Sequence, residues 1–209
     1  MNQIIKANII KNKRTKAANN DTPELKKKRQ KFLDWLLVEN YNLKVLEMYP
    51  GEEDVIKSKL QTPQYIHEYQ YCNTRTIIES ETDAEIDKLN WDEALKIIWD
   101  ICERLIQFKF HFVLFCSEGS RSPHIRIYDF DQLKTLKSYQ REKAQEFFWK
   151  RIADTNYKHL DKSIWSDDHL IQLEFAPHWK TGNPFILIYE HLPQKKLKRE
   201  GEKQCKICI

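Results

Sequence analysis

Two glutamates, Glu79 and Glu81, are the first residues along this sequence whose type and spacing could do chemistry. They follow residues 74–78, a β-branched segment that is predicted to form a strand. Side chains two residues apart on a strand point to the same face. Two carboxylates on one face at a strand end would suit a hard divalent cation such as Mg²⁺ or Mn²⁺. The same acids would also suit the start of a solvated loop, so the pair alone leaves both interpretations open.

A second polar group lies in residues 119–124, between two predicted hydrophobic strands. Its members carry hydroxyl, guanidinium and imidazole groups, all of which can bind a phosphate: Ser120, Arg121, Ser122 and His124. Backbone N–H groups exposed in such a turn can bind phosphate as well. The alternative is a polar hairpin turn that contains one capped histidine.

A third group lies in residues 178–182, where His178 and Lys180 flank Trp179 and Gly182 follows. Lys180 could meet a triphosphate and Trp179 could stack on a base. The glycine permits a sharp turn at this point. An ordinary surface loop would have the same composition, so this group also leaves two interpretations open.

These groups are positioned by alternating strands and helices. The predicted order is strand, helix, strand, strand, helix, strand, strand, over residues 74–78, 91–107, 111–116, 124–128, 139–157, 170–175 and 185–189. This order predicts an α+β fold built on a split βαββαβ sheet, similar to that of RNA-recognition modules, with its helices on one face. Thr22 and Pro23 predict the start of a helix in an N-terminal extension of that core.

The length of 209 residues predicts one domain with tails. Residues 1–20 are predicted to be a flexible basic arm, residues 21–194 the folded domain, and residues 195–209 a basic tail. The tail contains Cys205 and Cys208 in a CxxC spacing, which is half of a zinc site. It would otherwise be a loose end, or the point where a longer protein continues.

The composition excludes several classes of protein. Hydrophobic residues make up 41% of the chain and charged residues 32%, which is enough apolar material for a folded core. No apolar run approaches the roughly 20 residues of a membrane span, and 4 glycines are too few for a glycine-rich phosphate loop. Five irregularly spaced cysteines favour a reducing, cytoplasmic location. The net charge of +4 suits a polyanionic partner, although solvated basic tails would give the same value.

Taken in order, the three groups resemble the motifs of the archaeo-eukaryotic primase superfamily, also called the primase-polymerase superfamily. Glu79-x-Glu81 stands at its acid-x-acid motif, Ser122-Pro123-His124 at its S-x-H motif, and His178 through Gly182 at its histidine and Lys-Thr-Gly stretch. Leu160-Asp161 and residues 164–167 are similar to the segment that carries the third acid of the family. The resemblance covers residues 70–190.

This resemblance implies a primase-type fold, most like the small catalytic subunit, and a nucleotidyltransferase activity. Such an enzyme makes or extends primers on a single-stranded DNA template from NTPs or dNTPs, with Mg²⁺ or Mn²⁺ as cofactor. Its partners would include a primase large subunit or a helicase, and no membrane. By position, the implied metal ligands are Glu79, Glu81 and Asp167, with Asp168 as the alternative third acid. The implied nucleotide-binding residues are Ser120, Arg121, Ser122, His124, His178 and Lys180, with His124 also counted among the catalytic residues.

Two departures from the family pattern affect what the resemblance implies. The first motif has glutamates where the family usually has aspartates, and the extra methylene would shift a bound metal ion. Gln172 stands where many small subunits have an arginine. Two other classes therefore remain: a non-catalytic accessory subunit that binds nucleic acid or a primase partner, and an unrelated RNA-recognition module.

Overall fold

The computed structural model describes residues 20–39, 43–46, 72–86, 89–117, 122–166, 169–178 and 181–192. The predicted arm, apart from Asn20, and the predicted tail with Cys205 and Cys208 lie outside these residues. The helices are α2 (Pro23–Glu39), α3 (Trp91–Gln107) and α4 (Ser138–Ala153), and short 3-10 helices cover Asp131–Leu133, Asp154–His159 and Lys162–Trp165. The strands are β1 (Val45–Leu46), β2 (Thr74–Thr76), β3 (Thr82–Glu85), β4 (Phe112–Ser117), β5 (His124–Ile127), β6 (Leu170–Gln172) and β7 (Phe185–His191).

The described strands form two antiparallel sheets. One sheet has four strands in the order β3-β5-β4-β7, and the other has three in the order β1-β2-β6. The predicted α+β class is therefore confirmed. The expectation of one sheet is wrong, because residues 74–76 and 170–172 pair with each other in the smaller sheet. The first strand of the larger sheet is instead β3, which lies within the acidic segment after residue 78.

Local signals explain why α3 forms where the sequence predicts it. The Asn90 side chain accepts a hydrogen bond from the Glu93 N–H at 3.0 Å and so caps the first turn. One face of the helix is fully buried, and it carries Ala94, Ile98, Ile101, Cys102 and Leu105. This three- and four-residue spacing is the pattern of a helix that packs on a sheet.

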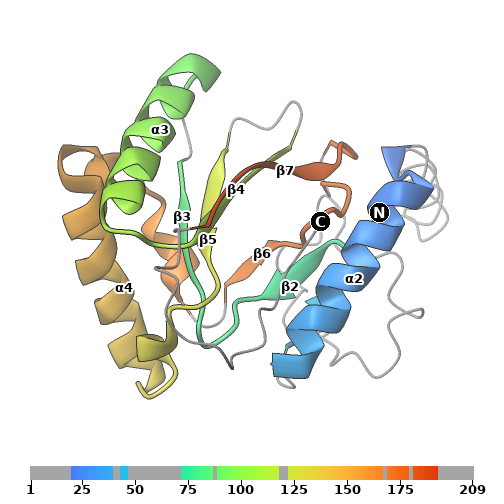
Figure 1. Ribbon diagram of the computed structural model, residues 1–209, viewed down its shortest axis with the longest axis horizontal. Coiled ribbons are helices and arrows are strands. Elements are labelled where there is room, and N and C mark those ends of the chain that lie inside the picture. Colours follow the sequence, from blue (N-terminus) through green and yellow to red (C-terminus); the bar gives the residue numbers. More distant parts are fainter. Residues whose placement is uncertain are drawn as a thin grey trace, which may run out of the picture.

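The larger sheet has different partners on its two faces (Figure 1). Helices α3 and α4 cover one face, where alternate strand residues such as Ala84, Leu114 and Ile125 join their core. The other face packs against α2 and the smaller sheet through Val113 and Phe115. Because side chains alternate along a strand, the residues between the apolar ones point to this second face. Several of those residues are charged, and they make up the layer between the two sheets.

Candidate functional site

A buried ion network joins the two sheets. The guanidinium of Arg75 on β2 donates to both carboxylate oxygens of Glu81 at 2.6 Å each. It also donates to both oxygens of Glu174, at 2.9 Å and 2.6 Å. All three side chains are 0% exposed. Each charge is therefore paired in a place where an unpaired charge would be very costly.

Arg126 on β5 extends this network from the larger sheet. Its guanidinium donates to Oε1 of Glu174, and to the carbonyl of Gln172 at 2.8 Å. The Tyr128 hydroxyl donates to the same Glu174 oxygen at 2.7 Å. Burial alone would raise the pKa of Glu174, but the positive charges of Arg126 and Arg75 outweigh it and lower this pKa to about 2. Glu174 is therefore ionised and connects β6 to β5.

Asp83 on β3 is the least satisfied member of the network. Arg126 Nε lies 3.2 Å from Asp83 Oδ2, but neither carboxylate oxygen of Asp83 has a hydrogen-bond partner among the described residues. Burial and the nearby charge of Glu81 raise the pKa of Asp83 well above its ordinary value, against the attraction of Arg126. A protonated Asp83 leaves two guanidinium groups facing two carboxylates, so the buried charges balance.

The structure does not place Glu79 and Glu81 together as the sequence predicts. Strand β2 ends at Thr76, and Glu79 lies in the following turn with its side chain exposed. Glu81 is buried, both its oxygens are bound to Arg75, and Oε2 also accepts from the Ile78 N–H at 3.2 Å. The expectation that the two glutamates share one strand face is therefore wrong. Their separate environments follow from the turn between them.

A different glutamate lies beside His124. Antiparallel pairing of β3 and β5 sets Glu85 opposite His124, and Glu85 Oε1 is 3.6 Å from His124 Nε2. The backbone N–H of Asp161 donates to the Glu85 carbonyl at 2.9 Å, which brings a second carboxylate residue to this strand end. Asp161 is half-buried, and its Oδ1 accepts from the Ser163 N–H at 2.9 Å. Sequence reasoning missed Glu85, although it lies two residues after Asp83 and therefore on the same face of β3.

His124 is neutral in this environment. Burial, together with the positive charge of Arg126, lowers the pKa of His124 to about 3. The ring packs edge-on against Phe185 of β7, with 5.1 Å between the ring centroids. His124 can therefore act as a neutral hydrogen-bonding group near a ligand, but not as a fixed positive charge.

The loop that leads into β7 folds back on itself around His178. Its carbonyl accepts from the Gly182 N–H at 2.7 Å, and its Nδ1 accepts from the Thr181 N–H at 3.3 Å. A neutral His178 ring with Nδ1 as acceptor carries its proton on Nε2. Gly182 has a φ of 76°, which confirms the predicted glycine turn. The Ser117 hydroxyl at the end of β4 donates to the Asn183 carbonyl at 3.3 Å, so the last residues of this loop are held against the end of β4.

Several predicted site residues lie outside the described part of the chain, so their positions stay predictions. These residues are Ser120, Arg121, Asp167, Asp168 and Lys180. Ser122 is described and is half-buried just before β5. Within the described residues, the structure brings His124, Glu85 and Asp161 to one strand end. It places His178 in the neighbouring loop, which runs into β7 at Phe185.

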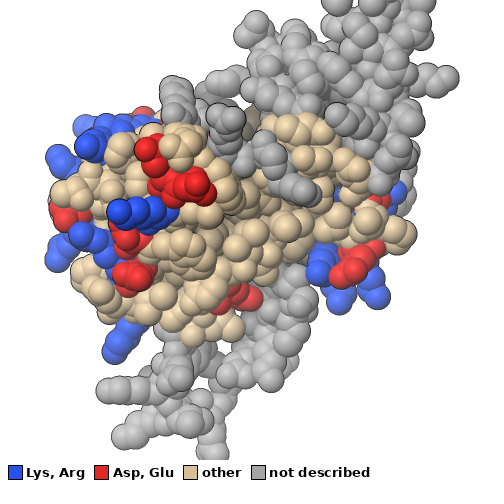
Figure 2. Space-filling view, turned by 90° about the horizontal axis from the view of Figure 1, so that it is seen from above, with Lys and Arg blue, Asp and Glu red and all other residues tan. Residues whose placement is uncertain are grey.

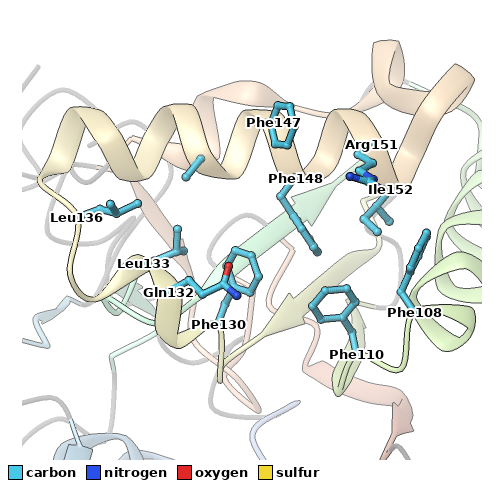
Figure 3. Close-up of a pocket in the computed structure, with 11 residues that line it drawn as sticks. Phe108, Phe110, Phe130, Gln132, Leu133, Leu136, Phe147, Phe148, Arg151 and Ile152 are labelled. Atoms are coloured by element: carbon cyan, nitrogen blue, oxygen red, sulfur yellow. The ribbon is translucent and has the colours of Figure 1, made fainter.

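An apolar pocket lies on the opposite side of the larger sheet, beneath α4, with a volume of about 400 Å³ (Figure 3). Phe148 of α4 points into it toward Phe130 and Phe110, with ring centroids 4.7 Å and 5.1 Å apart. Gln132 and Arg151 supply the polar atoms of its lining. None of its lining residues is a carboxylate, so the pocket offers shape and apolar contact instead of acid or metal chemistry.

The charged surface does not by itself mark a nucleic-acid site. On the face seen in Figure 2, lysine and arginine side chains are interspersed with acids near α3 and α4, and a mainly uncharged area separates them from the charges around α2. Within the described ranges, no three His, Cys, Asp or Glu side chains are arranged to hold a metal ion. No helix among these residues is long and apolar enough to cross a membrane.

The sequence matches no protein-family model, and no curated protein or solved structure matches it. Function is therefore inferred from the residues and their geometry. At the strand end with Glu85 and His124, a carboxylate and an imidazole lie 3.6 Å apart, and a second carboxylate residue, Asp161, is held to the same strand by its backbone.

Proposed function

We propose that this chain is a nucleotidyltransferase domain of the primase-polymerase type, with a primase-like fold. It would extend primers on a single-stranded DNA template from nucleoside triphosphates. The observation that supports this function best is the meeting of Glu85, His124 and Asp161 at one strand end. A carboxylate beside an imidazole, next to a loop of phosphate-type donors, suits a site for a triphosphate and a divalent cation.

The carboxylates that fit a cation differ from those predicted first. Glu81 has both oxygens occupied by Arg75, whereas the Glu85 side chain is 19% exposed and Asp161 is half-buried. We therefore assign Mg²⁺ or Mn²⁺ binding to Glu85 and Asp161, and Asp167 stays the predicted third acid. A divalent ion bound there would offset triphosphate charge and favour ionisation of the attacking 3′-hydroxyl.

The protein's own donors would orient the triphosphate. His178 carries its proton on Nε2 when neutral, because Nδ1 accepts from Thr181, and an N–H at that atom can donate to a phosphate oxygen. His124 would donate as a neutral ring from the base of the same site. Ser120, Arg121, Ser122 and Lys180 keep their predicted roles as phosphate-binding residues.

Nucleotide binding tests the assignment of the acids. In calorimetric titrations with a nucleoside triphosphate and Mn²⁺, we expect Glu85→Gln to weaken binding at least about tenfold, because it removes a carboxylate charge from the cation site. The matched control is Glu79→Gln, the same substitution at an exposed turn residue, and it should bind as the wild type does. Loss of binding in Glu79→Gln with retention in Glu85→Gln would overturn this assignment and favour the acid pair predicted from the sequence.

His124→Ala is a less direct test of the same site. The ring is buried against Phe185, so its removal would leave a cavity as well as remove a ligand contact. His124→Asn keeps a hydrogen-bonding group, and we expect this variant to remain folded while nucleotide affinity falls. A folded His124→Asn protein with unchanged affinity would remove His124 from the nucleotide site.

A further inference from the structure

The segment before α2 contacts the loop that carries His178. The Asn20 side chain donates to the Gly182 carbonyl at 3.0 Å and lies 3.4 Å from the Asn183 Oδ1 atom. These contacts span 162 and 163 positions of sequence. Asn20 is half-buried, so its hydrogen bonds are partly shielded from competing water.

Helix α2 also holds the start of the same loop. Arg29 forms a two-pronged ion pair with Asp21 at 2.9 Å and 2.7 Å, and its Nη1 donates to the Phe175 carbonyl at 3.0 Å. Phe175 has a φ of 59°, a left-handed conformation that is costly for a residue with a side chain. The Phe32 ring of α2 packs edge-on against the Phe175 ring at 6.1 Å. Helix α2 is therefore anchored where this loop leaves the smaller sheet.

Between these two anchors, the loop is tied together internally. His178 and Gly182 are joined by the hydrogen bond from the Gly182 N–H to the His178 carbonyl. The His178 N–H donates in turn to the Asn183 carbonyl at 2.6 Å. A displacement of the Gly182 carbonyl is therefore transmitted directly to the backbone of His178.

We propose that Asn20 is a positioning residue of the nucleotide site. By donating to the Gly182 carbonyl, Asn20 fixes the position of the loop. The loop in turn fixes the position of the His178 ring relative to the triphosphate. This inference rests on the proposed nucleotide-binding function. It adds that the N-terminal segment, which carries none of the predicted chemical groups, controls the affinity of the site.

The test compares Asn20→Ala and Asn20→Asp with the wild type. Asn20→Asp keeps the shape of the side chain but cannot donate to a carbonyl. We expect both variants to weaken nucleoside triphosphate binding about tenfold, the equivalent of one lost hydrogen bond. The unfolding temperature should fall only slightly, as for one lost hydrogen bond, and affinity for single-stranded DNA should stay at the wild-type value. Amide exchange at Gly182 should become faster in both variants, because the loop loses its anchor.

Thr22→Ala is the matched control, since Thr22 is exposed and its Oγ1 accepts from the Leu25 N–H at 3.3 Å, a bond at the first turn of α2. It should lower the unfolding temperature slightly and leave nucleotide affinity unchanged. Equal losses of affinity in Thr22→Ala and Asn20→Ala would show a general effect of α2 and overturn the proposal. Wild-type affinity in Asn20→Ala, with binding lost in His178→Ala, would overturn the proposal alone. A wild-type protein that binds no nucleotide would overturn the proposed function together with it.

Discussion

Asp83 shows how a single carboxyl group can lower stability inside a well-paired network. Its neighbours Glu81 and Glu174 already balance Arg75 and Arg126, so a third negative charge has no cation of its own. Burial and Glu81 raise the pKa of Asp83, so folding is coupled to proton uptake at pH values between the unfolded and the native pKa of this group. A buried carboxyl group with a raised pKa makes its full contribution to the free energy of unfolding only below the pKa of an unfolded aspartate. That contribution falls as the pH rises.

Asp83→Asn should therefore stabilise the protein at pH 7. The amide supplies an N–H donor toward Glu81 without a proton from solvent, so we expect a gain on the order of 1 kcal/mol, or about 3 °C in unfolding temperature. Because the native pKa of Asp83 is raised, the gain should shrink as the pH falls toward 4, where the unfolded carboxyl is also protonated. Urea unfolding at pH 4, 5.5 and 7 measures this. A destabilised variant at pH 7, or a gain that does not depend on pH, would contradict a protonated Asp83.

At the residue scale, the sequence predicts the role of a residue better when its partners are near in the chain than when they are distant. The Asn90 cap and the turn at Gly182 depend on neighbours within a few positions, and both are confirmed. The role of Glu81 depends on Arg75, whose other partner, Glu174, lies 99 positions further along the chain. Glu81 itself lies only six positions from Arg75, but no sequence motif marks the two as an ion pair, so the sequence predicts metal binding for a glutamate that pairs with an arginine.

Among the elements, the contact between β5, β2 and the end of β6 depends most on Glu174. This residue accepts hydrogen bonds from Arg75, Arg126 and the Tyr128 hydroxyl. The two sheets are therefore joined at this buried carboxylate and at the hydrogen bond from Arg126 to the Gln172 carbonyl, beside a shared apolar core.

Glu174→Gln should weaken the contact between the sheets. An amide cannot neutralise the two guanidinium groups, and breaking a buried ion pair costs about 3–5 kcal/mol. We expect a loss of that size in the free energy of unfolding, measured by urea denaturation. Glu79→Gln, at an exposed turn, provides the comparison and should change stability by less than about 0.5 kcal/mol. A loss below 1 kcal/mol in Glu174→Gln would mean that the sheets do not depend on this carboxylate.

The elements with regular apolar spacing were predictable, and the polar ones were not. Helix α3 and strand β4 follow their periodicity, because their partners are simply apolar. Strand β3 has the sequence Thr-Asp-Ala-Glu and lacks a strand composition, yet its first three residues are buried. Tertiary pairing with β5 outweighs its low strand propensity.

At the scale of the whole molecule, the layers explain why the candidate site lies where it does. Helices α3 and α4 close one face of the larger sheet, and α2 with the smaller sheet closes the other (Figure 1). Charged residues of the second face are buried where the sheets overlap. Toward the end of β3 they become partly exposed at Glu85, next to His124. The candidate site therefore lies at the border of a buried charged layer.

The sequence predicts part of this site. His124 and His178 occur in recognisable motifs, and the structure places them near Phe185, one against its ring and the other in the loop before it. The acids were not predictable in the same way, because several acids occur between residues 79 and 87 and only the strand register selects among them. The division of the strands into two sheets could not be predicted from the sequence either, because β2 pairs with β6, nearly a hundred residues later in the chain.

Primer extension tests the proposed function most directly. The assay uses a single-stranded DNA template, an annealed primer, Mn²⁺ and either NTPs or dNTPs, with wild-type, Glu85→Gln and Glu79→Gln proteins. We predict extended products from the wild type and from Glu79→Gln, and a loss of at least about a hundredfold in Glu85→Gln, because the cation site loses a ligand. If the wild type yields no product while binding template and nucleotide, the chain is an accessory subunit instead of the polymerase. Undiminished extension by Glu85→Gln would contradict the assigned site.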